Sequence, residues 1–163
     1  MEVHPSGLLR IDSSSAQPRT PIPCSARVSD PPETLLVVDD DPMVRQVEVK
    51  FLSRLGYKVL QADGAAEALR LADATAAIHL LITDLSMPEI DGVELTRRFR
   101  AVHPKTPVLM VSGSLPLIHE RIGDLEHFET LEKPFMPDEL LHRVSRLLQA
   151  AAPLPIRNRS GGG

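Results

Sequence analysis

Between residues 34 and 150, short apolar segments alternate with stretches of helical periodicity, and this alternation limits the possible folds. The apolar segments are 34–38, 57–62, 78–83, 107–111 and 128–131. The helical stretches are 42–55, 64–74, 92–102, 115–122 and 137–150. Strands that are apolar on both faces and alternate with helices are typical of a parallel sheet covered on both sides. Because crossovers between parallel strands are right-handed, we predict a doubly wound α/β fold with helices on both faces.

The first helical stretch shows how the sequence marks the ends of an element. Asp41 suits the N-cap, Pro42 suits the first turn, and Gly56 follows the last helical residue. The apolar residues that we predict to share one side of this helix are Val44, Val47, Phe51, Leu52 and Leu55.

Length and local composition predict one folded domain with two unstructured ends. The chain has 163 residues, which fits a single domain that we place at 34–150. Residues 1–33 are rich in Ser and Pro and have few recurring apolar positions, so burial cannot offset the entropy of ordering. We therefore predict a disordered leader at 1–33 and a flexible tail at 151–163.

Charge and cysteine content exclude several classes of function. The net charge of -4 argues against nucleic acid as a direct partner, because phosphate binding requires a basic surface. The single cysteine, Cys24, can build neither a disulfide framework nor a zinc site. No run of about 18 apolar residues or signal-peptide core is present. We therefore expect a cytoplasmic protein without membrane insertion.

Polar residues follow several of the predicted strands. Asp39 and Asp40 follow the first, Asp84 follows the third, Ser112 the fourth and Lys133 the fifth. In open α/β sheets ligands bind beyond the carboxyl ends of the strands. Crowded carboxylates repel one another, and a hard divalent cation such as Mg²⁺ relieves this repulsion. A carboxylate nucleophile, a Mg²⁺ bridge and a lysine are the groups that phosphoryl transfer requires.

Simpler explanations exist for the acids taken one at a time. Asp39, Asp40 and Asp41 could stabilise the N-terminus of the following helix, and we accept this reading for Asp41. Asp84 could cap a turn, but that reading predicts no polar partners at other strand ends. Lys133 follows another strand, and so the combination favours a metal and phosphoryl site.

Four motifs in this order resemble the response regulator receiver domain of two-component signalling. They are Leu36–Pro42 (LVVDDDP), Asp84–Gly92 (DLSMPEIDG), Val111–Gly113 (VSG) and Glu132–Phe135 (EKPF). The resemblance covers about residues 34–150 and includes receivers attached to hybrid histidine kinases. It implies a flavodoxin-like (βα)5 fold whose five parallel strands have the order 2-1-3-4-5.

The resemblance also implies which residue accepts the phosphoryl group and which residues bind the metal ion. Asp84 would accept a phosphoryl group from a histidine of a sensor kinase or phosphotransfer protein. Asp40 and Asp84 would bind Mg²⁺ or Mn²⁺ directly, and Asp39 would bind it through water. The backbone carbonyl of Ser86 would complete the protein ligands.

Further positions in the resemblance concern the phosphoryl group and the response to it. Ser112 and Lys133 would contact the phosphoryl group, and the Lys133–Pro134 peptide bond would be cis. Members of the family usually have an aromatic residue at the switch position, which here is Thr130. Phe128 would lie on the same side of the strand and could substitute weakly for that aromatic residue.

Two functions remain open from the sequence. The first is a phosphoacceptor switch, read out by a partner or relayed onward, because the residues after the last helix are too few for an output domain. Such a protein would assist only its own phosphorylation and dephosphorylation and would not otherwise be an enzyme. The second is a receiver-fold scaffold that does not switch, which Thr130 and the short helix at 115–122 favour. An aspartyl phosphatase fits poorly, because Ser86 stands where those enzymes generally carry a second aspartate.

Overall fold

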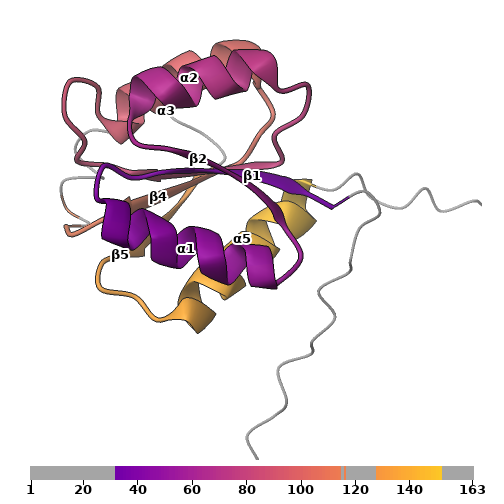
Figure 1. Ribbon diagram of the computed structural model, residues 1–163, viewed down its shortest axis with the longest axis vertical. Coiled ribbons are helices and arrows are strands. Elements are labelled where there is room, and N and C mark those ends of the chain that lie inside the picture. The colour runs from indigo at the N-terminus through magenta and orange to yellow at the C-terminus, as the bar shows by residue number, and fades with distance from the viewer. Residues whose placement is uncertain (1–31, 115, 117–127, 152–163) are drawn as a thin grey trace, which may run out of the picture.

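The computed structural model describes residues 32–114, 116 and 128–151 (Figure 1). Nearly all of the predicted leader, most of the predicted helix at 115–122 and most of the predicted tail lie outside these residues. The elements are β1 (Thr34–Val38), α1 (Pro42–Arg54), β2 (Lys58–Ala62), α2 (Ala65–Ala74), β3 (Leu80–Asp84), α3 (Gly92–Val102), β4 (Val108–Ser112), β5 (Phe128–Glu132) and α5 (Pro137–Ala151).

The strands form one parallel sheet in the order β2-β1-β3-β4-β5. This confirms the doubly wound fold and the strand order that the resemblance implied. Every residue of β1, β3 and β4 is buried, as expected for strands covered on both faces. The chain order reverses between β1 and β3, and ligands of such sheets bind beside this switch point.

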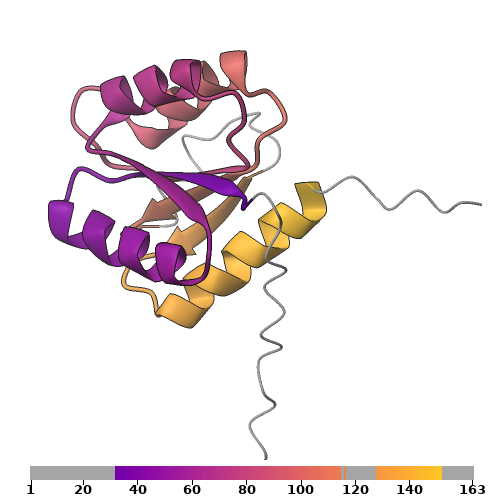
Figure 2. The same cartoon turned by 45° about the vertical axis from the view of Figure 1, so that its right-hand side comes forward.

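The helices form two layers, one on each face of the sheet (Figure 2). Helices α1 and α5 cover one face, and α2 and α3 cover the other. The core under α1 and α5 includes Val37, Leu52, Ile82 and Val144. Phe99 of α3 is fully buried in the core on the opposite face. Burying each such side chain contributes about 1.5–3 kcal/mol.

One of the five apolar residues predicted to share one side of α1 lies outside that side, whereas the other four are buried or half-buried. Val47 is 63% exposed, so the prediction that it lies on the same side of the helix as Leu52 is wrong. Glu48 is only 3% exposed and lies one helical turn before the fully buried Leu52. Glu48, Leu52 and Leu55 are spaced by three or four residues and therefore lie on one side of the helix. Val47 lies outside the buried side.

Strand β5 is linked to α5 through one glutamate. Glu129 accepts a hydrogen bond from Arg143 at 3.1 Å and forms an ion pair with Arg146 at 2.9 Å. The Glu129 side chain is 16% exposed, whereas both arginines are more accessible. Its two carboxylate oxygens thus bind two consecutive turns of α5.

Within the ranges that the structure describes, no helix has the length and apolar character needed to cross a membrane.

Candidate functional site

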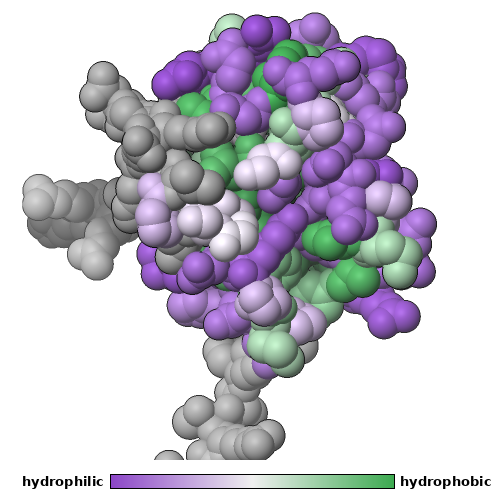
Figure 3. Space-filling view, turned by 90° about the vertical axis from the view of Figure 1, so that its left-hand side faces the viewer, coloured by the Kyte–Doolittle hydropathy of each residue, from purple (hydrophilic) through white to green (hydrophobic). Residues whose placement is uncertain are grey.

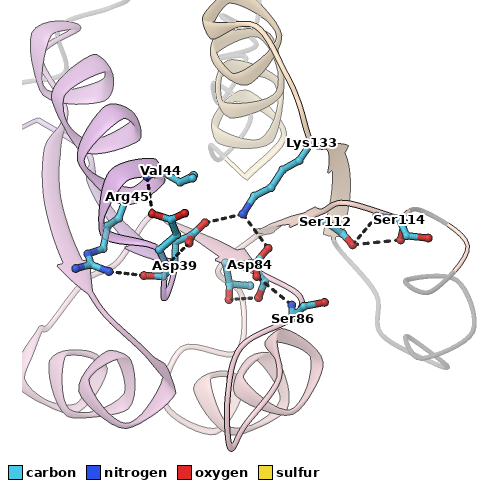
Figure 4. Close-up of polar contacts among 10 residues, drawn as sticks. Asp39, Val44, Arg45, Asp84, Ser86, Ser112, Ser114 and Lys133 are labelled. Carbon is cyan, nitrogen blue, oxygen red and sulfur yellow. Dashed lines mark hydrogen bonds and ion pairs between the residues drawn. The ribbon is translucent and has the colours of Figure 1, made fainter.

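Asp39, Asp84 and Lys133 meet at the carboxyl edge of the sheet (Figure 4). Lys133 Nζ lies 2.7 Å from Asp39 Oδ2 and 3.1 Å from Asp84 Oδ1. Asp39 follows β1, Asp84 is the last residue of β3, and Lys133 follows β5. The two aspartates are 2% and 7% exposed, so the ammonium group balances two carboxylates that are almost out of solvent.

The protonation of Lys133 follows from this pairing. Burial alone would lower the pKa of its ammonium group. Hydrogen bonds to Asp39 and Asp84, together with their negative charges, outweigh burial and raise the pKa above its ordinary value of 10.5. Lys133 is therefore a permanent positive charge at neutral pH.

Backbone groups hold the two aspartates in place. The Asp41 N–H donates to Asp39 Oδ1 at 2.8 Å, and the Ser86 N–H donates to Asp84 Oδ2 at 3.1 Å. The Arg45 guanidinium donates to the Asp39 backbone carbonyl. Each carboxylate thus has one oxygen fixed by the main chain and one oxygen on Lys133.

The loop after Asp84 is anchored by its own apolar residues. Leu85 is 1% exposed and Met87 is 8% exposed. The N–H of Gly92, at the start of α3, donates to the Leu85 carbonyl at 2.9 Å. A Cβ added at Gly92 would lie 2.3 Å from the Asp84 backbone oxygen, so a residue without a side chain is required at this approach.

Replacing Gly92 by Ala is expected to displace the loop that carries Asp84. Backbone would have to move, which we expect to lower the free energy of unfolding by about 1–3 kcal/mol. Urea denaturation measures this effect, and Gly64→Ala is the matched control because an added Cβ there meets nothing within 4 Å. Equal stabilities of the two variants would contradict the steric argument.

Ser112 and Thr130 lie near the site but do not bond to Asp84. Ser112 is 1% exposed, and its hydroxyl exchanges hydrogen bonds with the backbone of Ser114 at 3.1 and 3.2 Å. The Lys133 N–H donates to the Ser112 carbonyl at 2.8 Å, which aligns the ends of β4 and β5. Thr130 is half-buried on β5, and the Lys133–Pro134 peptide bond is cis.

Phe128 occupies a structural position in the core. It lies two residues before Thr130 on β5 and packs against Leu85, Val93 and Met110. Its half-buried ring is therefore held between the sheet and the α3 side of the domain.

The predicted metal ligands are only partly brought together. Asp39 and Asp84 converge on Lys133, whereas Asp40 is exposed and so is Ser86. Among the described residues, no group of three His, Cys, Asp or Glu side chains is arranged to hold a metal ion. The donor set still fits a hard divalent cation, because the converging groups are carboxylate oxygens that only one lysine balances.

Glu48 is a titratable residue near this site that the sequence reasoning missed. Its Oε1 atom is buried and has no hydrogen-bond partner among the described residues. Burial raises the pKa of its carboxyl group to about 8, and the charges of Asp39 and Asp84 add to this rise while Lys133 opposes it. The signal in the sequence was its position one turn before Leu52, on the helix face where an apolar residue is expected.

The fold and the site together define a class of protein. A flavodoxin-like sheet carries acids after its first strand and at the end of its third, and a lysine after its fifth. Residues 35–145 match the family model of the response regulator receiver domain, and the chain belongs to this family. The resemblance to this family is thereby confirmed, and the chain is a receiver domain of two-component signalling.

Individual relatives support this assignment. The chain is 35% identical over 120 residues to chemotaxis protein CheY1 of Helicobacter pylori, an alignment that covers 70% of this chain and 95% of CheY1. It is 39% identical over 120 residues to protein PetR of Rhodobacter capsulatus, covering 72% of this chain and 49% of PetR. The chain thus spans about half the length of PetR.

A solved receiver structure adds a comparison in three dimensions. The receiver domain of sensor histidine kinase PA1611 from Pseudomonas aeruginosa PAO1 superposes with a TM-score of 0.66 and 26% identity. The superposition covers 72% of this chain and 98% of that one. That structure contains a magnesium ion coordinated in its active-site cleft.

Proposed function

We propose that this receiver domain is a phosphoacceptor switch in which Asp84 takes a phosphoryl group from a histidine of a sensor kinase or phosphotransfer protein. The observation that carries the proposal is the placement of Lys133 between Asp84 and Asp39, at 3.1 and 2.7 Å. A lysine held on a carboxylate in this way can neutralise the charge of a phosphoryl group added there. A protein with this role would act in the cytoplasm.

In the proposed reaction an oxygen of Asp84 forms a bond to phosphorus as the bond from phosphorus to the histidine nitrogen breaks. The histidine nitrogen keeps the electron pair of the broken bond. The Ser86 N–H orients the Asp84 carboxylate through Oδ2. Lys133 supplies hydrogen-bond donors and positive charge for the phosphoryl oxygens, which is how most catalysis of phosphoryl transfer is achieved.

A divalent cation fits the acidic side of this site. Asp39, Asp40, Asp84 and the backbone carbonyl of Ser86 would hold Mg²⁺ or Mn²⁺, in keeping with the magnesium site of the PA1611 receiver. When bound, the cation would neutralise charge on the phosphoryl oxygens. The protein would act only on its own phosphoryl group and would not be an enzyme for other substrates.

Incubation with acetyl phosphate and Mg²⁺, followed by intact mass spectrometry and peptide mapping, tests the proposal. We expect a mass increase of one phosphoryl group on the peptide that contains Asp84, and no adduct when a chelator is present from the start of the incubation. The absence of an adduct, or its location on another peptide, would instead favour the scaffold that does not switch.

Exposed apolar side chains border the proposed site and support docking of a protein donor. Met43 near the start of α1 is 73% exposed, and Met136 just before α5 is 67% exposed. Figure 3 looks onto the carboxyl ends of the strands and shows separate hydrophobic patches on a mostly hydrophilic face. A partner that brings a phosphohistidine to Asp84 would cover this face.

Replacing Met43 and Met136 together by Ser is expected to slow phosphoryl transfer from a histidine kinase by about tenfold or more, because their burial would be lost. The rate with acetyl phosphate should not change, since a small donor needs no docking surface. Val102→Ser is the control, because Val102 is 46% exposed at the far end of α3. Equal losses with both donors would place the defect in Asp84 chemistry and not in docking.

A further inference from the structure

We propose that Glu48 is a proton-releasing residue of the phosphoacceptor site, protonated while Lys133 alone balances Asp39 and Asp84, and ionised when a divalent cation binds there. The inference rests on the proposed function. It concerns a residue outside the predicted ligands, and it makes cation binding and proton release one coupled event.

The position of Glu48 is the first argument. It is 3% exposed on the inner face of α1, and its Oε1 atom accepts no hydrogen bond from any described residue. Leu52, one turn later, belongs to the core under α1 and α5. A buried polar atom without a partner is rare and costs stability, so its presence calls for an explanation.

The charges around Glu48 are the second argument. Asp39 from the end of β1, Asp84 from the end of β3 and Lys133 after β5 all act on its carboxyl group. The residues of α5 that face the same core are apolar and supply no charge: Leu140, Val144, Leu147 and Leu148. Burial is the main cause of the raised pKa of Glu48, and the charges of the phosphoacceptor site add to it or oppose it, so a change of charge at that site changes the pKa.

The sign of the coupling follows from this arrangement. With Lys133 alone, ionisation of Glu48 would add a third negative charge to the two carboxylates that already act on its carboxyl group. A divalent cation at Asp39 and Asp84 adds positive charge on the same side, which favours the ionised carboxyl. Glu48 then gives its proton to the buffer, and by linkage the apparent affinity for the cation rises with pH.

A purely structural role for Glu48 predicts a different outcome. A carboxyl that only fills space would keep its proton whatever binds at Asp84. Cation binding would then release no proton from it, and an amide of the same shape would behave identically. Proton release therefore separates the two roles without reference to phosphorylation.

Calorimetric titration of the full chain with Mg²⁺ in two buffers of different ionisation enthalpy measures the protons released per cation. We expect a fraction of one proton at neutral pH and almost none above about pH 9, where Glu48 is already ionised. Glu48→Gln should release no proton. Its Mg²⁺ affinity should not change with pH, whereas that of the wild type should rise several-fold from neutral pH to about pH 9. Glu94→Gln is the control, because Glu94 is an exposed glutamate paired with Arg98 on α3.

Infrared spectroscopy of the wild type gives a second readout that needs no variant. The carbonyl band of a protonated carboxyl should be present at neutral pH and decrease on addition of Mg²⁺. Binding of Mg²⁺ without proton release, or equal release by Glu48→Gln, would overturn the inference. Absence of Mg²⁺ binding would overturn it as well, whereas the acetyl phosphate experiment reports separately on Asp84.

Discussion

Replacement of Asp84 by Asn is expected to abolish the phosphoryl adduct while the domain stays folded. An amide oxygen is a far weaker nucleophile than a carboxylate, and the acyl phosphate has no other acceptor at this position. Asn has the same shape and can still accept the hydrogen bond from the Ser86 N–H. Intact mass after incubation with acetyl phosphate and Mg²⁺ measures the loss, and circular dichroism checks the fold.

Asp41→Asn is the matched control for this experiment. Asp41 caps α1 by accepting from the Met43 N–H at 2.8 Å, and Asn is an equally good N-cap. The adduct should form on this variant as on the wild type. An adduct that persists in Asp84→Asn would refute Asp84 as the acceptor.

Replacement of Glu48 by Gln is expected to remove a large pH dependence of stability. The pKa of Glu48 is about 8 in the folded protein, against an ordinary value of 4.5. The folded state therefore retains a proton that the unfolded chain gives up between these values. The contribution of this proton to the free energy of unfolding is fully present below pH 4.5. It decreases as the pH rises and is lost above about pH 8.

The size of this effect follows from the same interval. Between pH 4.5 and about 8, at about 1.36 kcal/mol per pH unit, the loss is on the order of 5 kcal/mol. Urea denaturation of both proteins from pH 5 to 9 measures it. Glu48→Gln should gain stability over the wild type as the pH rises, and a constant difference would contradict the raised pKa.

Local sequence patterns were sufficient to predict the strands and helices that the structure describes. Strand and helix limits differ from the predicted ranges by at most two residues, because Pro, Gly and apolar periodicity mark most of the ends. The error in α1 had a specific cause. Counting only apolar residues placed Val47 on the buried side. The buried position one turn before Leu52 is residue 48, which is a glutamate and was therefore not counted.

The candidate site was predictable in its members but not in its contacts. Asp39, Asp84 and Lys133 each follow or end a strand, so their meeting at one edge of the sheet follows from the topology. The distances do not follow, because Lys133 and Asp39 are 94 residues apart and their contact depends on the whole sheet. Likewise, the hydroxyl of Ser112 is engaged by Ser114, a local contact that no motif specifies.

The two ion pairs of Glu129 connect β5 to two consecutive turns of α5. Lys133 directly follows β5, and Glu129 of the same strand is paired with two arginines of α5. We expect movement of Lys133 toward a phosphoryl group to be transmitted to α5 through these ion pairs. The outer surface of α5 would then report the state of Asp84 at a distance, without any contact between the two.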